Sequence, residues 1–111
     1  MQPSFHLSLP VPRIEESVDF FTSLLGATVT HRDARYVNLE LCGVQLTLTI
    51  GDAPPPSELH FGVNLPLAQF DALAARMQIE PLVVDAGTPM ERRKLYVRCP
   101  AGYRIEVKGY A

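Results

Sequence analysis

Two segments of the chain alternate apolar and polar residues in the manner of half-buried β-strands. In residues 5–11 and again in residues 59–65, the odd-numbered positions are apolar and face one way. The polar positions of the two segments are His6 and Ser8, then His60, Gly62 and Asn64. Because His6 and His60 lie 54 residues apart in matching patterns, the sequence predicts an internal repeat.

Helical periodicity follows each of these strands. Apolar residues recur at helical spacing between 14 and 25, and Gly26 is a typical C-terminal stop. A second apolar stripe within residues 70–77 predicts a helix that begins shortly after Pro66. Each half of the chain therefore starts with a strand and then a helix.

Three short strands are expected after each helix. They are Thr28–Arg32, Tyr36–Leu41 and Val44–Ile50 in the first half, and Leu82–Asp85, Lys94–Arg98 and Tyr103–Lys108 in the second. The last strands of the two halves align at an offset of 59 through turns containing Gly43 and Gly102. The sequence thus predicts an α+β fold of two β-α-β-β-β modules.

Each module holds around fifty residues, too few to bury a sheet alone. We expect a single domain over 1–111, with modules at approximately 1–51 and 58–111 joined by a stiff proline-rich linker. The sheets of the two modules should curve together as a mixed sheet around one interior, with the helices covering the outside.

Strand parity places polar side chains on the face opposite the helices. Four of them occupy corresponding depths in four strands: His6, Thr47, His60 and Glu106. Two imidazoles and one carboxylate form a facial triad, which binds a divalent ion and leaves positions open for substrate. Singly, each has an ordinary explanation, such as a hydrogen-bonded strand histidine or a glutamate paired with Lys108 or Arg104. Their equivalence in the repeat favours the metal site.

Composition narrows the functional classes. Ten basic and twelve acidic residues give a net charge of -2, which argues against a general nucleic-acid or membrane-surface binder. No apolar run approaches the roughly 20 residues of a membrane helix, and no signal-peptide pattern occurs. Cys42 and Cys99 are expected to be reduced thiols. His31 has no partner in the repeat and is expected to be a surface or turn residue. We expect a cytoplasmic protein.

Three segments, FHLSLPVPRIEESVDFFTSLLGA, ELHFGV and CPAGYRIEVKGY, resemble the vicinal oxygen chelate superfamily. It includes glyoxalases, bleomycin-resistance proteins, fosfomycin-resistance transferases and extradiol dioxygenases. The resemblance implies metal ligands at His6, His60 and Glu106. Its fourth ligand position, Glu in glyoxalases, falls on Thr47, which is a poor ligand. Extradiol dioxygenases and fosfomycin transferases use three protein ligands, as this chain would.

The resemblance also implies a catalytic role for Tyr96, because relatives place a tyrosine there against metal-bound substrate. A packed strand tyrosine is the alternative. Substrate-pocket candidates are Ser8, Gln45, Thr47 and Asn64. The strand holding Gln45 lacks the acid-base histidine of extradiol enzymes, and the loop 87–94 lacks the serine-rich pattern of fosfomycin transferases. Its basic run at 92–94 is expected to be a solvated strand edge, with attraction of an anionic substrate as the alternative.

The resemblance therefore implies a divalent-metal-dependent enzyme acting on a small molecule through neighbouring oxygens. A dioxygenase-like reaction is preferred because Thr47 replaces the fourth ligand, with Fe2+ as the preferred ion and Zn2+, Ni2+ or Mn2+ as alternatives. A glyoxalase-like lyase or isomerase, and a non-catalytic antibiotic- or metabolite-binding protein, remain open. The family resemblance also implies a homodimer, in which His6 joins His60 and Glu106 of its own chain or of its partner.

Overall fold

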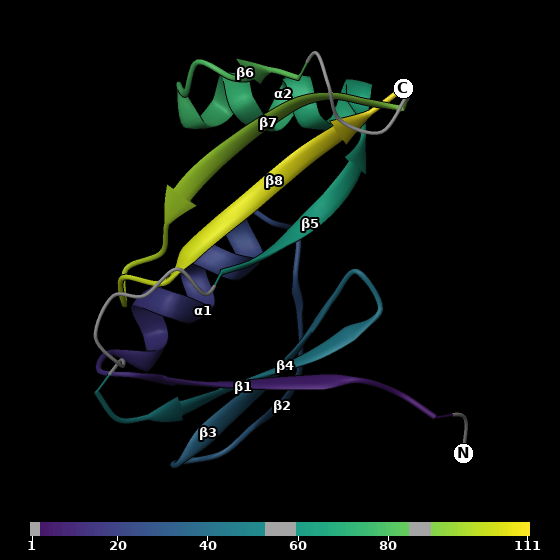
Figure 1. The fold of residues 1–111 in the computed structure, drawn as a ribbon. Coiled ribbons are helices and arrows are strands. Elements are labelled where there is room, and N and C mark those ends of the chain that lie inside the picture. Colours follow the sequence, from purple (N-terminus) through teal and green to yellow (C-terminus); the bar gives the residue numbers. More distant parts are fainter. Residues whose placement is uncertain (1–2, 53–59, 85–89) are drawn as a thin grey trace. The chain divides into compact units, whose positions relative to one another are not determined.

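The computed structural model describes residues 3–52, 60–84 and 90–111. They form two units (Figure 1). The N-terminal unit contains residues 3–52 together with Cys99–Tyr103, and the C-terminal unit contains residues 60–84, 90–98 and 104–111. The predicted linker prolines, the predicted strand ends at Leu59 and Asp85, and the loop residues 87–89 lie outside the described residues.

The N-terminal unit has one helix and a four-stranded mixed sheet. Its elements are β1 (His6–Val11), α1 (Ile14–Ser23), β2 (Thr28–Arg32), β3 (Tyr36–Leu41) and β4 (Val44–Ile50). The strand order is β1-β4-β3-β2, with β1 and β4 parallel and the other pairs antiparallel. α1 packs on β3 and β4 through its buried residues Val18 and Phe21.

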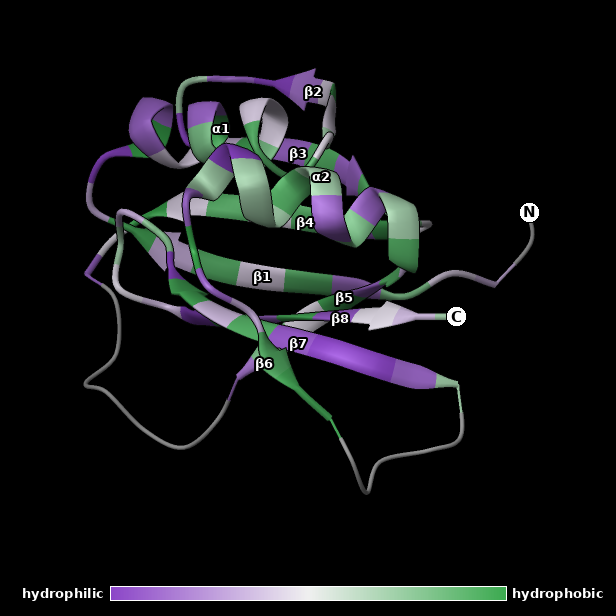
Figure 2. Ribbon diagram, turned by 90° about the horizontal axis from the view of Figure 1, so that it is seen from above, coloured by the Kyte–Doolittle hydropathy of each residue, from purple (hydrophilic) through white to green (hydrophobic). Residues whose placement is uncertain are grey.

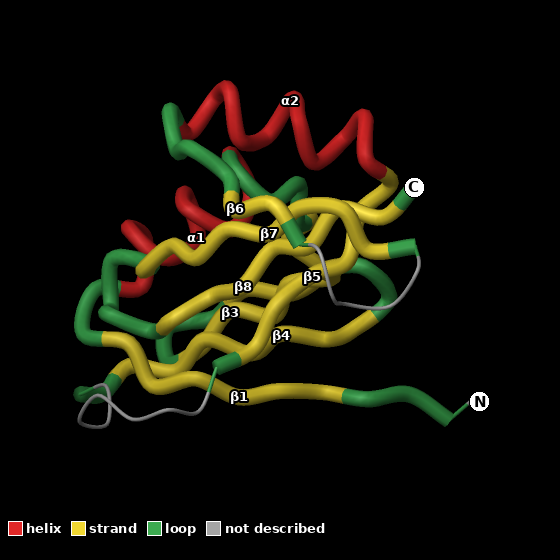
Figure 3. Tube along the Cα trace, turned by 45° about the horizontal axis from the view of Figure 1, so that its top comes forward, coloured by secondary structure: helices red, strands yellow, loops and turns green. Residues whose placement is uncertain are grey.

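The C-terminal unit repeats this arrangement. Its elements are β5 (Phe61–Pro66), α2 (Leu67–Met77), β6 (Leu82–Val83), β7 (Glu91–Arg98) and β8 (Arg104–Tyr110). The order is β5-β8-β7-β6, again with the first and last strands parallel. α2 lies along this sheet (Figure 3) and buries Phe70, Leu73 and Ala74. The α+β class and the repeated β-α-β-β-β order are therefore confirmed.

The strands form two four-stranded mixed sheets, one in each unit. One strand boundary differs from the sequence-based expectation. β7 begins at Glu91, three residues earlier than predicted, because the ladder continues past an irregularity between Glu91 and Arg93 to pair Glu91 with Tyr110. In the part of the chain that the structure describes, no helix is long and apolar enough to cross a membrane.

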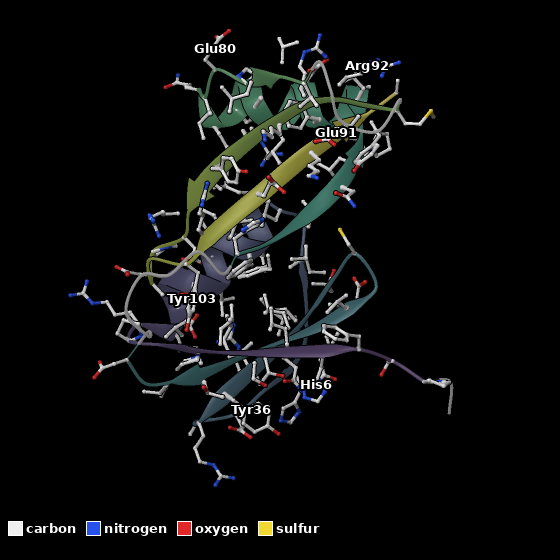
Figure 4. The ribbon with its side chains drawn as sticks, in the orientation of Figure 1. His6, Tyr36, Glu80, Glu91, Arg92 and Tyr103 are labelled. Atoms are coloured by element: carbon white, nitrogen blue, oxygen red, sulfur yellow. The ribbon has the colours of Figure 1, made fainter. Side chains whose placement is uncertain are left out.

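Strands β1, β3, β4, β5 and β8 bury alternate residues, and Figure 2 shows hydrophobic and hydrophilic positions alternating along the central strands. β2 and β6 are exposed throughout. In β8, Ile105 and Val107 are fully buried, whereas Glu106 points to the other face. The turn between β7 and β8 groups with the N-terminal unit, where the Tyr103 hydroxyl donates a 2.8 Å hydrogen bond to the Pro10 carbonyl (Figure 4). The opposite polar face of the C-terminal sheet is where the candidate site lies.

The parallel pairing of β5 with β8 brings Gly62 directly beside Glu106. A Cβ atom built on Gly62 would lie 2.8 Å from the Glu106 carbonyl carbon and 3.2 Å from its Cα. Both are main-chain atoms, so the strands themselves would have to move apart. Glycine at this position therefore allows the close approach that places Glu106 next to β5.

We expect Gly62→Ala to lower the free energy of unfolding by about 1–3 kcal/mol, the usual range for overpacking. Urea denaturation measures the change. The matched control is Ser8→Ala, because Ser8 pairs with Thr47 as Gly62 pairs with Glu106 and already carries a Cβ. That variant should stay within about 0.5 kcal/mol of the unmodified protein. Equal stability of both variants would contradict the close approach.

Candidate metal centre

The strand registers give the predicted site residues equivalent places in the two sheets. Ser8 pairs with Thr47 in the N-terminal sheet, and Gly62 pairs with Glu106 in the C-terminal sheet. Thr47 therefore occupies the position that Glu106 occupies in the other unit, as the repeat alignment predicts. His60 precedes Gly62 by two residues and lies just before the start of β5.

Three of the predicted residues come together on the C-terminal sheet. His60 Nε2 lies 3.6 Å from Glu106 Oε1, and the Tyr96 hydroxyl donates a hydrogen bond to the same carboxylate. The His60 and Tyr96 rings meet edge to face, with centroids 6.0 Å apart. The Glu106 side chain is only 13% exposed, whereas that of His60 is 38% exposed. The cluster therefore combines a mostly shielded carboxylate, which interacts with Tyr96, and a more exposed imidazole.

Cations keep this carboxylate charged. Burial alone would raise the pKa of Glu106, but the Tyr96 hydrogen bond and the charges of Lys108, His60 and Lys94 outweigh it, so the pKa is lowered. The Lys108 Nζ lies 3.8 Å from Glu106 Oε1 and 3.6 Å from Glu91 Oε1. Burial acts to lower the pKa of Lys108, yet these two carboxylates raise it overall. Glu106 is therefore ionised at neutral pH, the state that a metal ligand needs.

The spacing of the two donors suits a shared ion. At 3.6 Å the imidazole nitrogen and the carboxylate oxygen are too far apart for a hydrogen bond. Both groups are ligand types that divalent ions accept, and they are close enough for one ion to be held between them. No group of three or more His, Cys, Asp or Glu side chains in metal-binding proximity occurs among residues 3–52, 60–84 and 90–111. The C-terminal sheet therefore offers two of the three predicted ligands.

Asn64 is the other candidate on the C-terminal sheet, where it pairs with Lys108 between β5 and β8. The remaining candidates lie on β1 and β4 of the N-terminal sheet: His6, Ser8, Gln45 and Thr47. His6 (Figure 4) is exposed at the start of β1 and pairs with Gln45. His6 belongs to the N-terminal unit, whereas His60 and Glu106 belong to the C-terminal unit.

Thr47 is held in a neutral hydrogen-bond chain. It donates a 2.8 Å hydrogen bond to Asn38 Oδ1 and accepts one of 3.3 Å from Gln45 Nε2. Asn38 pairs with Thr47 as Tyr96 pairs with Glu106, so the equivalent pair in this unit is uncharged. Sequence reasoning missed Asn38, although its repeat equivalence to Tyr96 was a usable signal.

Two basic residues contact Tyr96, and sequence reasoning did not connect them with it. The Arg104 guanidinium carbon lies 4.0 Å from the Tyr96 ring centroid, and the Lys94 Nζ lies 5.8 Å from it. The predicted basic run at 92–94 does not act as one patch, because Arg93 pairs with Asp71 of α2 at 3.3 Å. His31 lies 3.5 Å from Asp33 and is exposed, as expected for a surface residue.

Comparison with known proteins defines the family to which this chain belongs. The sequence profile of the Glyoxalase/Bleomycin resistance protein/Dioxygenase superfamily matches residues 4–107, so the chain belongs to this superfamily. No curated protein sequence matches the chain.

Solved structures share the fold over nearly the whole chain. A glyoxalase/bleomycin resistance protein/dioxygenase from Alicyclobacillus acidocaldarius is 24% identical, with a TM-score of 0.74 over 98% of this chain and 92% of that one. The fosfomycin resistance protein FosX from Listeria monocytogenes is 14% identical, with a TM-score of 0.81 over 100% and 93%. Lactoylglutathione lyase from Agrobacterium tumefaciens is 15% identical, with a TM-score of 0.70 over 98% and 94%.

We expect Tyr96→Phe to raise the pKa of Glu106 in the metal-free protein, because the variant removes a hydrogen bond to the ionised form. Carboxyl-carbon NMR titration measures the change. A lowered pKa stabilises the fold above the unfolded-state value of 4.5, and that stability is lost as the pH falls through the folded-state value. The variant should therefore lose part of this contribution. Tyr36→Phe, in the other unit, should leave the pKa of Glu106 unchanged, and an equal effect would contradict the assignment.

Proposed function

We propose that this protein is a divalent-metal-dependent enzyme that binds a small molecule through two neighbouring oxygens, with a dioxygenase-like reaction preferred. The observation that carries the proposal is the 3.6 Å separation of His60 Nε2 and Glu106 Oε1, with Tyr96 bonded to the same carboxylate. A mostly shielded, ionised carboxylate beside an accessible imidazole is an arrangement typical of functional sites.

His60 and Glu106 supply two ligands in this proposal, and His6 supplies the third. The support for His6 is its equivalence to His60 in the repeat and its exposure on the polar face of β1. It comes from the same chain or from a second copy in a homodimer. Thr47 is not assigned as a ligand, because a neutral hydroxyl is a poorer ligand for a divalent ion than a carboxylate. Three protein ligands leave positions open for substrate and dioxygen.

Iron is the preferred ion, since it supports oxygen chemistry, and manganese, zinc or nickel are the alternatives. FosX from Listeria monocytogenes was crystallised with Mn(II), which supports a divalent ion on this fold. When bound, the ion would polarise the chelated oxygens as a Lewis acid and favour the charged form of the substrate.

The chain's own residues have separate tasks in this proposal. Tyr96 orients Glu106 and presents a phenol beside the place where substrate oxygens would bind. The Lys108 ammonium group pairs with both Glu106 and Glu91. It can therefore keep its ion pair with Glu91 when Glu106 binds a metal ion. Ser8, Gln45, Thr47 and Asn64 are proposed to line the substrate pocket, and the protein is proposed to act in the cytoplasm.

Metal analysis of the purified, tag-free protein tests the site. We expect near-stoichiometric metal by elemental mass spectrometry, and a loss of affinity of more than about 100-fold in His6→Ala, His60→Ala and Glu106→Ala, since even outer partners of a metal cost 10–100-fold. His31→Ala is the matched control, because His31 pairs with Asp33 on another strand. A folded protein that binds no iron, manganese, nickel or zinc would overturn the proposal in favour of a metal-free binding protein.

The reaction class is tested by oxygen uptake. We expect the iron-loaded protein to consume dioxygen in the presence of a catechol from a panel of vicinal diols, and the zinc-loaded protein to consume none, because zinc has no redox chemistry. Glu106→Gln, which should lose the ion, is the background control. Redox-neutral turnover of a hemithioacetal, without oxygen uptake, would instead establish a glyoxalase-like lyase or isomerase.

A further inference from the structure

Glu91 is a buried carboxylate on the polar face of the C-terminal sheet (Figure 4). Its side chain is only 7% exposed, and its Oε1 lies 3.6 Å from Lys108 Nζ. Burying a carboxylate costs free energy unless a cation or hydrogen bonds compensate it. The ion pair with Lys108 is therefore what allows Glu91 to be buried here.

An irregularity in β7 turns Glu91 onto this face. Arg93 pairs with Gly109. Glu91 lies two residues earlier and pairs with Tyr110, the next residue along β8. In a regular strand, residues two apart share a face, so Glu91 would lie on the face of Arg93. The irregularity places it instead on the face of Lys108, and strand irregularities that re-aim a side chain are frequent beside functional sites.

The Lys108 ammonium group is shared by Glu91 and Glu106. Its Nζ lies 3.8 Å from Glu106 Oε1, which is also the oxygen that lies 3.6 Å from His60 Nε2. A divalent ion bound to this oxygen would meet the ammonium as a like charge a few ångströms away, where repulsion in a partly buried site is strong. A metal ion and Lys108 would therefore compete for Glu106.

Resting on the proposed function, we propose that Lys108 is an internal cation that occupies Glu106 in the metal-free protein, and that Glu91 is the positioning residue that receives it when a metal ion binds. The distances from Lys108 Nζ to the two carboxylates, 3.6 Å and 3.8 Å, are nearly equal, so a small movement of the flexible lysine is enough. Without Glu91, the incoming ion would have to displace the ammonium from its partner. Glu91 thus raises the affinity for the metal without contacting it.

The affinity of the metal-free protein for Zn2+, measured by competition with a chromophoric chelator, tests this exchange. We expect Glu91→Gln to weaken Zn2+ binding about tenfold, which is the lower end of the effect of residues that act on a metal through its ligand. Glu91→Asp, which keeps the carboxylate on a shorter side chain, should lie between. The double variant Glu91→Gln/Lys108→Gln should return to within about threefold of the unmodified protein, because the competing cation is gone.

The matched control is Asp71→Asn, which removes a carboxylate of α2 that pairs with Arg93. It should leave the Zn2+ affinity unchanged. A double variant as weak as Glu91→Gln would overturn the proposal, since a structural defect or the loss of a bare charge would not be rescued at Lys108. An unchanged affinity in Glu91→Gln would overturn it as well.

NMR of the metal-free protein separates this proposal from the proposed function. In Glu91→Gln, the hydrogen-bond coupling between Lys108 Nζ and the Glu106 carboxyl carbon should grow, because Glu106 becomes the ammonium's carboxylate partner. Release of the ammonium to solvent would overturn the proposal, whatever the metal does. If neither the unmodified protein nor the double variant binds Zn2+, the proposed function fails and the exchange with it. If every variant binds Zn2+ equally, the exchange alone is wrong.

Discussion

The parallel pairing of first and last strands within each unit is the constraint on which the candidate site depends. In the C-terminal unit it joins β5 to β8, so that a histidine just ahead of one strand lies 3.6 Å from the glutamate in the middle of the other. Gly62 permits the strands to approach closely at the level of Glu106. Without that approach, His60 Nε2 and Glu106 Oε1 would lie farther apart. The cations that lower the pKa of Glu106 would also lie farther from its carboxylate.

The two units use the same positions for different chemistry. Where the C-terminal sheet has Tyr96 hydrogen-bonded to Glu106, the N-terminal sheet has Asn38 hydrogen-bonded to Thr47. The first pair is charged and surrounded by basic residues, and the second is neutral. Duplication of the module thus explains the geometry of both pairs, while divergence at these positions concentrates charge on one sheet.

Much of the fold could be predicted from the sequence, because alternation and helical spacing mark every helix and strand to within about three residues, β7 being the strand whose start differs most. The repeat also predicted that Glu106 and Thr47 are equivalent. The surroundings of Tyr96 could not be predicted, because they depend on how β7 pairs with β8. The pairing of β7 with β8 contains an irregularity between Glu91 and Arg93. It lies in a polar stretch whose sequence pattern predicts a loop, so the pairing register could not be derived from the pattern. The register alone decides that Lys94 and Arg104, and not Arg93, meet the tyrosine.

The central proposal is that His60 and Glu106 bind a metal ion together with His6. Paramagnetic NMR with Mn2+ tests it most directly. Small amounts of Mn2+ added to the isotope-labelled, metal-free protein should broaden the resonances of His60, Gly62, Tyr96 and Glu106 first, and those of His6 equally early. Broadening centred on His31 and Asp33, or spread evenly over the acidic surface, would contradict the account.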